Sequence, residues 1–192
     1  MPQSNPAALD FLLTRRSRPA KTLAPPVPNK AELSPLLEAA ARTPDHGKLE
    51  PWRFVVLERP ALSRIGEAVL AHGAAHGMDT DRSEKQALDF SRAHLAVMVV
   101  SSPKPSEKIP EIEQVLSAGA VCLALLNAAL AAGWGANWLS GWATHDTEFR
   151  QTHLGLASHE TVAGLIHIGT ETSVPPERPR PNLEAITTWV VA

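Results

Sequence analysis

The chain has 192 residues and a formal net charge of -2. This length fits one domain with a substantial core, and the near-neutral charge provides no basic field of the kind that recruits nucleic acid. The single cysteine, Cys122, excludes an internal disulfide and a metal site built from cysteines. Because residues 1–10 lack a basic start followed by an apolar run, we expect no signal peptide and a cytoplasmic protein.

The first predicted element is a helix that begins at Asn5-Pro6, a capping residue followed by proline. This helix runs directly into Arg15-Arg16-Ser17-Arg18. Guanidinium groups match the oxygens of a phosphate, so the basic segment suits an anionic ligand. On composition alone, a solvated basic turn is the alternative.

A second helix is predicted to begin either at Asn29, with Glu32 three residues on, or at Ser34-Pro35, and to end at Arg42. The following loop contains prolines and a glycine that prevent regular structure. It concentrates side chains with chemical capability, namely His46, Lys48, Trp52 and Arg53. Such a loop favours a functional site, and a plain surface loop is the alternative.

Three apolar runs predict buried strands, and three other segments predict helices. The strands are expected over Phe54–Leu57, Leu95–Val100 and Thr161–Gly169. The helices are expected over Ala61–His76, Asp79–His94 and Asp146–Leu154. We expect His167, inside the last strand, to be a core histidine with its hydrogen bonds satisfied.

His72 and His76 stand four residues apart on a predicted helix, a spacing that suits a metal ion. No acidic residue near them in the sequence completes a ligand set. We therefore expect a solvated helix end there and no metal site. A hydrolase or metal enzyme that uses these two histidines and His46 is an alternative function that shares this weakness.

The segment Ser117–Gly133 predicts the helix around which the domain is organised. Only Ser117 and Asn127 in it are polar, and a helix that is apolar on all sides is a buried helix. A membrane span needs about 20 apolar residues, more than this run contains, so we expect no membrane partner. The sequence predicts a central helix at the heart of the domain or of a dimer.

Apolar strands separated by helices predict an α/β or α+β sandwich, formed by one domain over residues 1–192. The usual catalytic motifs are missing from the sequence. Trp138 stands where a dinucleotide fingerprint needs its third glycine, there is no P-loop, and Ser140-Gly141 does not form a nucleophile elbow. Any reaction is therefore expected to depend on the chemistry of a bound cofactor.

Several of these segments follow one another in a specific order. They are Arg15-Arg16-Ser17, the loop from Pro44-Asp45-His46 to Pro51-Trp52-Arg53-Phe54, the Ala-rich helix, the turn Gly135–Gly141, a GxxxxG strand and a late basic segment with prolines. In this order and spacing the chain resembles the FMN-dependent nitroreductase family, and within it the compact single-domain branch. The resemblance covers essentially the whole chain.

The resemblance implies an α+β fold in which helices flank a central sheet and one long helix is buried. It also implies a homodimer that forms through long helices and carries two FMN sites at its interface. Arg42 and His46 match positions that reach the flavin from the other subunit. These expectations concern FMN bound between two copies of the chain.

The other residues that the resemblance assigns to FMN come from the two ends of the chain and from the turn after the central helix. Arg15, Arg16 and Ser17 match the motif that holds the phosphate and the ribityl chain. Arg178 and Arg180 match a late basic pair near the phosphate. The isoalloxazine ring would be lined by Trp138, Leu139 and Ser140.

The activity that the resemblance implies is a ping-pong reaction. NAD(P)H would reduce FMN and leave, and a nitroaromatic, quinone or similar acceptor would then collect the electrons. No side chain has to act as an acid or base, although His46 could assist protonation. Larger family members often carry Ser, Asn and Gln where this chain has Asp45, Lys48 and Glu50. A non-catalytic flavin-binding or sensing protein of the same fold is the alternative.

Overall fold

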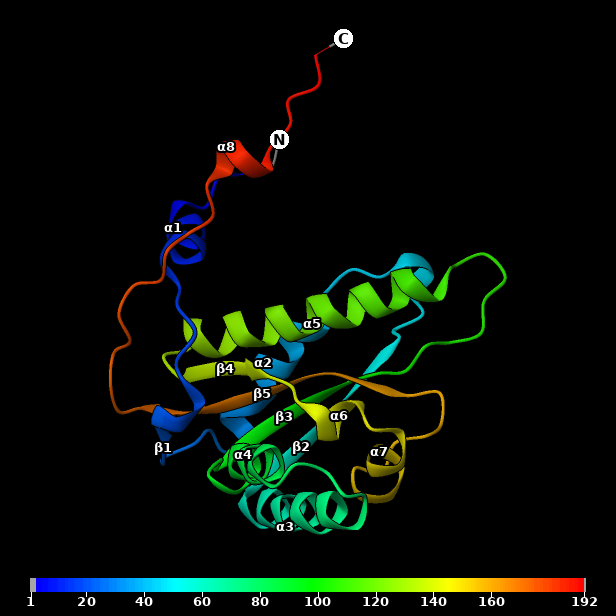
Figure 1. The fold of residues 1–192 in the computed structure, drawn as a ribbon. Helices are drawn as coiled ribbons and strands as arrows, with labels where there is room; N and C mark the ends of the chain where they lie inside the picture. Colours follow the sequence, from blue (N-terminus) through cyan, green and yellow to red (C-terminus); the bar gives the residue numbers. More distant parts are fainter. Residues whose placement is uncertain (1–2, 192) are drawn as a thin grey trace.

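The computed structural model describes residues 3–191 and folds them around one five-stranded sheet (Figure 1). The strands are β1 (Leu23–Ala24), β2 (Trp52–Glu58), β3 (Leu95–Ser101), β4 (Gly135–Leu139) and β5 (Thr161–Glu171). The α-helices are α1 (Pro6–Thr14), α2 (Lys30–Ala41), α3 (Arg59–Ala75), α4 (Thr80–Ser91), α5 (Glu111–Ala131), α6 (Trp142–His145), α7 (Thr147–His153) and α8 (Leu183–Ile186). Two short 3-10 helices are η1 (Ala20–Thr22) and η2 (His46–Lys48). The three strands predicted from the sequence are confirmed as parts of β2, β3 and β5.

The longest strand, β5, organises the sheet. It pairs with β3 along one side and with β4 along the other, and its last two residues pair with β1. The edge strand β2 pairs with β3, and every pairing is antiparallel. All residues of β3 are buried. This burial explains why the sequence of β3 reads as a continuous apolar run.

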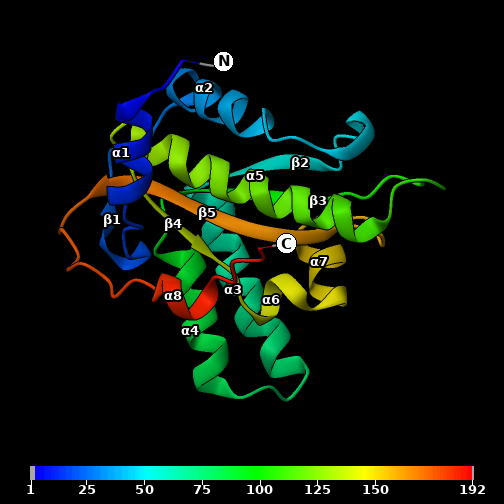
Figure 2. The same ribbon diagram turned by 90° about the horizontal axis from the view of Figure 1, so that it is seen from above.

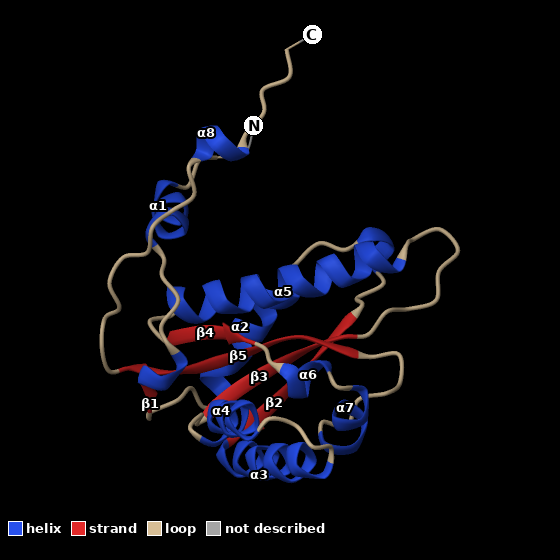
Figure 3. Cartoon of the chain, in the orientation of Figure 1, coloured by secondary structure: helices blue, strands red, loops and turns tan. Residues whose placement is uncertain are grey.

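Helices cover both faces of the sheet, so the fold is an α+β sandwich (Figure 3). On one face α2 and α5 pack around Val97 and Val99 of the central strand. On the other face α3, α4, α6 and α7 pack around Met98 and Val100. Successive residues of a strand point to opposite faces, so this single apolar run supplies both cores.

The start of α2 is fixed by its capping residues. Asn29 accepts hydrogen bonds from the N–H groups of Ala31 and Glu32, and the Glu32 carboxylate accepts one from the N–H of Asn29. This reciprocal capping box places the helix start at Lys30 and confirms the first of the two predicted starts. The second, Ser34-Pro35, lies inside the helix.

The central helix α5 begins at Glu111, six residues before the predicted apolar run. Its inward face packs on the sheet and buries Gln114, Ala118, Val121, Cys122, Leu125, Leu126 and Ala129. Its outward face is also apolar, yet Ile112, Leu116 and Leu123 are exposed. By length and composition α5 could cross a membrane, but its packing on the sheet is that of a core helix. One side of the helix is therefore buried in the domain, and the other is open to a partner.

Both ends of the described chain project beyond the layer formed by α5 (Figure 1), and Figure 2 views the molecule from that side. Helix α1 exposes Leu9, Leu12 and Leu13. The segment after β5 is exposed as far as it is described, and Trp189 in it is 86% exposed. Exposed apolar surface of this extent marks a site of interaction.

Candidate functional site

The arginine-rich segment that follows α1 is held against strand β4. The backbone N–H of Arg18 donates to the carbonyl oxygen of Ala136 (2.8 Å), and the Asn137 side-chain amide donates to the carbonyl oxygen of Arg18 (2.6 Å). These two bonds connect residues almost 120 positions apart in the sequence. They fix the basic segment next to the start of β4, just after the end of α5.

Three guanidinium groups come close together here, two from this segment and the third, Arg180, from the late basic segment. Burial and the nearby charges of Arg180 and Arg16 lower the pKa of Arg15. The Nη2 of Arg15 donates to the Ser17 hydroxyl (2.8 Å), and the Nη1 of Arg16 donates to the Ser17 carbonyl oxygen (3.1 Å). The Nε atoms of both arginines are buried without a hydrogen-bond partner in the described chain. Repelling cations with unused donors indicate a site for an anion.

Two carboxylates lie close to these arginines and neutralise part of the charge. Glu171 pairs with Arg18 (3.0 Å), and Glu177 pairs with Arg180 (2.6 Å). Arg178 lies exposed in the same segment as Arg180. The local balance is therefore positive, and the structure brings the early and late basic residues of the sequence to one place.

The end of β4 carries the three residues predicted to line a flavin ring. Trp138 is partly exposed, and its indole lies against Gly164 of β5, where a Cβ atom would overlap the ring. Leu139 is half-buried at the end of the strand, and Ser140 is exposed directly after it. The Arg18 backbone is hydrogen-bonded to Ala136 and to the Asn137 side chain. Trp138, Leu139 and Ser140 come directly after these contacts along the chain.

Arg42 and His46 lie in a different place in the chain. His46 Nδ1 contacts the Glu113 carboxylate (2.7 Å) in the first turn of α5, and the Ser117 hydroxyl donates to the Pro44 carbonyl oxygen (3.0 Å). The arginine segment lies beyond the other end of this helix. A 21-residue helix is about 30 Å long. Within one chain His46 therefore does not meet the arginine segment.

The loop that carries His46 has an unusual backbone. Gly47, Lys48 and Glu50 all adopt positive φ angles, of 75°, 55° and 48°. The Asp45 carboxylate accepts a hydrogen bond from the N–H of Leu49 (2.6 Å) and holds the loop closed. Residues other than glycine rarely adopt this left-handed backbone conformation. Backbone strain of this kind is concentrated at functional sites.

Glu50→Gly is expected to raise the free energy of unfolding by up to about 1 kcal/mol, because glycine adopts the left-handed conformation without steric cost. Urea denaturation measures the change. Glu38→Gly, at an exposed position inside α2, is the matched control and should lower stability by about 1 kcal/mol. Equal destabilisation by both changes would show that Glu50 carries no strain.

Arg53, which the sequence groups with the chemically capable residues of this loop, has a structural partner. Its Nε and Nη2 donate to the two carboxylate oxygens of Glu160, each at 2.7 Å. The N–H of Ala157 also donates to this carboxylate (2.9 Å). These bonds, Arg53 first, lower the pKa of Glu160 to about 2. The pair ties β2 to the start of β5 and leaves Arg53 unavailable for a ligand.

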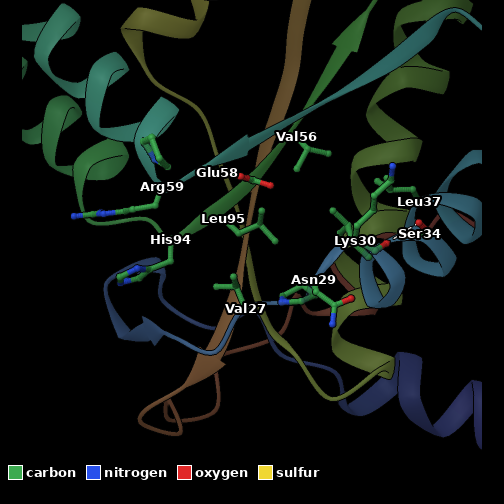
Figure 4. A pocket seen from close by; sticks show the side chains of 13 residues that line it. Val27, Asn29, Lys30, Ser34, Leu37, Val56, Glu58, Arg59, His94 and Leu95 are labelled. Atoms are coloured by element: carbon green, nitrogen blue, oxygen red, sulfur yellow. Dashed lines mark hydrogen bonds between the residues drawn. The ribbon is translucent and has the colours of Figure 1, made fainter.

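A separate cavity of about 610 Å³ lies between α2 and the edge strand β2. Figure 4 shows Lys30 and Leu37 of α2 on one side of it and Val56 and Glu58 on the other. Its lining includes none of the residues that the sequence assigns to a cofactor. We therefore build the candidate site on the arginine cluster and not on this cavity.

The three histidines considered for a metal enzyme do not gather at one place. His46 lies beside the start of α5, whereas His72 and His76 lie at the end of α3, against α7. The expectation that no acidic residue completes this pair is wrong, because Glu148 of α7 lies with both. The expectation of a solvated helix end is also wrong for His72, which is 7% exposed.

Two buried titratable groups lie outside the candidate site. Burial raises the pKa of the Cys122 thiol to about 12, which confirms its interpretation as a small core residue. Burial lowers the pKa of His167 to about 4, so this ring is neutral near pH 7. His167 is a core residue, as expected. The expectation that its hydrogen bonds are satisfied is wrong for Nε2, which has no hydrogen-bond partner in the described chain.

Comparison with known proteins identifies the family of this chain. A model of the nitroreductase family matches residues 12–170. The chain belongs to the nitroreductase family. A protein of Escherichia coli (strain K12) named "Putative NAD(P)H nitroreductase YdjA" is 37% identical over 164 residues, 85% of this chain and 87% of the relative. A Haemophilus influenzae protein with the corresponding name is 35% identical and covers 85% of this chain and 88% of its own length.

Solved structures show the same nitroreductase fold. A nitroreductase-like protein from Bacillus cereus matches with a TM-score of 0.79 and 21% identity, over 99% of this chain and 98% of its own. A nitroreductase with bound FMN from Bacteroides fragilis matches with a TM-score of 0.75 and 20% identity, over 98% and 100%. These likenesses confirm the α+β sandwich predicted from the sequence.

One residue that positions the candidate site was not singled out from the sequence. Asn137 holds the backbone of Arg18 through its side-chain amide. The available signal was a lone amide side chain inside a short apolar strand. Such a side chain needs a hydrogen-bond partner, but the sequence does not reveal which one.

Proposed function

We propose that this protein is an FMN-dependent oxidoreductase that takes electrons from NAD(P)H and reduces nitroaromatic, quinone or similar acceptors. The observation that carries the proposal is the convergence of Arg15, Arg16 and Arg180 beside β4, with two buried guanidinium nitrogens left unpaired. Membership of the nitroreductase family, the names of the relatives and the FMN in the Bacteroides fragilis structure support the same cofactor.

The residues present fit the phosphate of FMN. This group carries nearly two negative charges and strong acceptor oxygens. Burial and the charges of Arg180 and Arg16 lower the pKa of Arg15, and an anion would offset both effects. The Nε donors of Arg15 and Arg16, which have no partner in the described chain, would find acceptors. We propose that Ser17, Arg178 and Arg180 complete this end of the site.

We propose that Trp138, Leu139 and Ser140 border the flavin ring and shield one side of it from water. When bound, FMN supplies the redox chemistry, taking two electrons from NAD(P)H and passing them to a second substrate in a ping-pong sequence. The protein then needs no nucleophile of its own. The neutral, buried Cys122 agrees with this view, since a thiol with a pKa of about 12 does not ionise near neutral pH.

We propose that the active form is a homodimer, because one chain cannot supply both halves of the site. His46 lies about one helix length, roughly 30 Å, from the arginine cluster of its own chain. A second copy could bring its own Arg42 and His46 to that cluster. The exposed apolar surfaces of α1, of the outer face of α5 and of the segment around Trp189 provide area for such an interface. We place this homodimer in the cytoplasm.

Steady-state kinetics test the proposed activity. Oxidation of NADH and of NADPH should be stimulated by a quinone or a nitroaromatic compound, and double-reciprocal plots at several acceptor concentrations should be parallel, as a ping-pong reaction requires. Intersecting lines would contradict the ping-pong sequence. A flavin that is reduced once without sustained turnover would instead support the sensing protein.

A further inference from the structure

The ends of α3 and α7 bring together a group of side chains outside the proposed flavin site. His72 and His76 come from the last turn of α3 and its cap, and Glu148 comes from the first turn of α7. One ligand atom from each lies within 4.8 Å of the other two. Asp146, the capping residue of α7, lies 3.4 Å from His72 Nε2. In the sequence, His76 and Glu148 are about seventy residues apart.

The hydrogen bond of His76 fixes which ring nitrogen can bind a ligand. His76 Nδ1 lies 2.9 Å from the carbonyl oxygen of His72, which can only accept, so Nδ1 is the donor. The lone pair of a neutral His76 is then on Nε2, 3.3 Å from the Glu148 carboxylate. A cation between these two atoms, either a proton or a metal ion, would stabilise the pair. A backbone carbonyl bonded to the second ring nitrogen is the usual support of a metal-bound histidine.

The distances between the ligand atoms suit a metal ion as that cation. The imidazoles of His72 and His76 are stacked, with centroids 4.0 Å apart and planes inclined by 20°. The in-plane lone pairs of two stacked rings run side by side, so the half-exposed His76 ring would have to rotate for both rings to bind one ion. In a tetrahedral zinc site with bonds of about 2.0–2.1 Å, ligand atoms lie roughly 3.3 Å apart. The His76–Glu148 distance already has this value, and the third ligand atom needs only a small movement.

The exposure of the cluster suits the entry of an ion. His72 is buried against Phe149 and Trp142, which fix its ring. His76 and Glu148 are 45% and 67% exposed and can adjust to an ion that arrives from solvent. Three protein ligands leave a fourth position for water or for Asp146.

We propose that His72, His76 and Glu148 form a binding site for a divalent transition metal, zinc above all, that ties the end of α3 to α7. A donor set of two imidazoles and one carboxylate binds zinc in preference to magnesium or calcium. The role that we assign is structural, with Asp146 as the fourth ligand, because structural zinc sites are closed by four protein ligands. Helices α6 and α7 follow directly after Ser140, so the tie also steadies the end of β4.

Titration calorimetry of the tag-free, chelator-treated full-length protein with ZnCl₂ tests the proposal. We expect one zinc per chain and a rise in melting temperature on its addition. His76→Asn and Glu148→Gln should each weaken zinc binding at least about tenfold and abolish the thermal shift. Both positions are exposed, so these variants should fold, unlike some changes at the buried His72.

The matched control is His159→Asn, which removes an exposed histidine elsewhere and should leave zinc binding unchanged. Tetrahedral Co²⁺ bound in place of zinc should give intense visible bands that His76→Asn removes. The amount of FMN bound per chain should be the same in all variants. Failure to bind zinc, or binding that neither His76→Asn nor Glu148→Gln weakens, would overturn the proposal and leave a proton between His76 and Glu148.

Discussion

Arg16→Ala is expected to lower the affinity for FMN by about 30- to 150-fold, the loss of one charge-assisted contact worth about 2–3 kcal/mol. The Arg16 side chain is part of a cluster whose charges repel one another without an anion. Quenching of flavin fluorescence during titration of the flavin-free protein measures the change. Arg16→Lys keeps the charge but loses the planar fork, so its affinity should lie between those of the wild type and the alanine variant.

A second readout separates ligand binding from a structural role. Removing one of several repelling cations should leave the flavin-free protein equally stable or slightly more stable in urea. Arg64→Ala, at an exposed position on α3, is the control and should change neither FMN affinity nor stability. An Arg16→Ala variant that binds FMN normally would contradict the assignment, and one that loses stability would point to a structural arginine.

Arg53→Ala is expected to lower the free energy of unfolding by about 2–3 kcal/mol, because it leaves the Glu160 carboxylate buried without its ion-pair partner. Broken buried pairs typically cost roughly 3–5 kcal/mol, and the lower figure reflects the 41% exposure of the Arg53 side chain. Urea denaturation near pH 7 measures the loss. Arg150→Ala, on the short helix α7, removes an arginine without breaking this pair and should cost less. An Arg53→Ala variant as stable as the wild type would contradict the argument.

The same ion pair predicts how stability depends on pH. The pKa of Glu160 is lowered from 4.5 to about 2 in the folded protein. Its contribution is therefore fully present above about pH 4.5 and is lost as the pH falls toward about 2. The stability gap between the wild type and Glu160→Gln should be widest near neutral pH and should narrow through this acidic range. A gap that stays constant there would show that the Glu160 charge does not stabilise the fold.

Local signals in the sequence were sufficient for most elements of the fold. The capping residues Asn29 and Glu32 predicted the observed start of α2 as one of two possible starts, and the continuous apolar run of β3 predicted a strand buried on both faces. For α5 the apolar composition predicted a helix buried on all sides, but the helix has an exposed apolar side. A sequence pattern reports that a face is apolar and does not report whether the covering surface belongs to the same chain.

Contacts between distant parts of the chain could not be derived from local pattern. Glu160 meets Arg53 across 107 residues, and Glu148 meets His76 only because α7 packs on α3. The resemblance to the family predicted that Arg15 and Arg180 lie near the same phosphate, and in the structure the two side chains are close to each other. The distance between His46 and Arg16 within one chain could not be predicted, because it depends on the two residues lying at opposite ends of α5.

The measurement that tests the central claim most directly is the visible absorption spectrum of the protein purified without added cofactor, followed by addition of NAD(P)H under argon. The account predicts a bound flavin spectrum that bleaches on addition and returns when an acceptor is supplied. A colourless protein that does not take up added FMN would contradict the proposed function. The clustered arginines would then have to be explained by another anion.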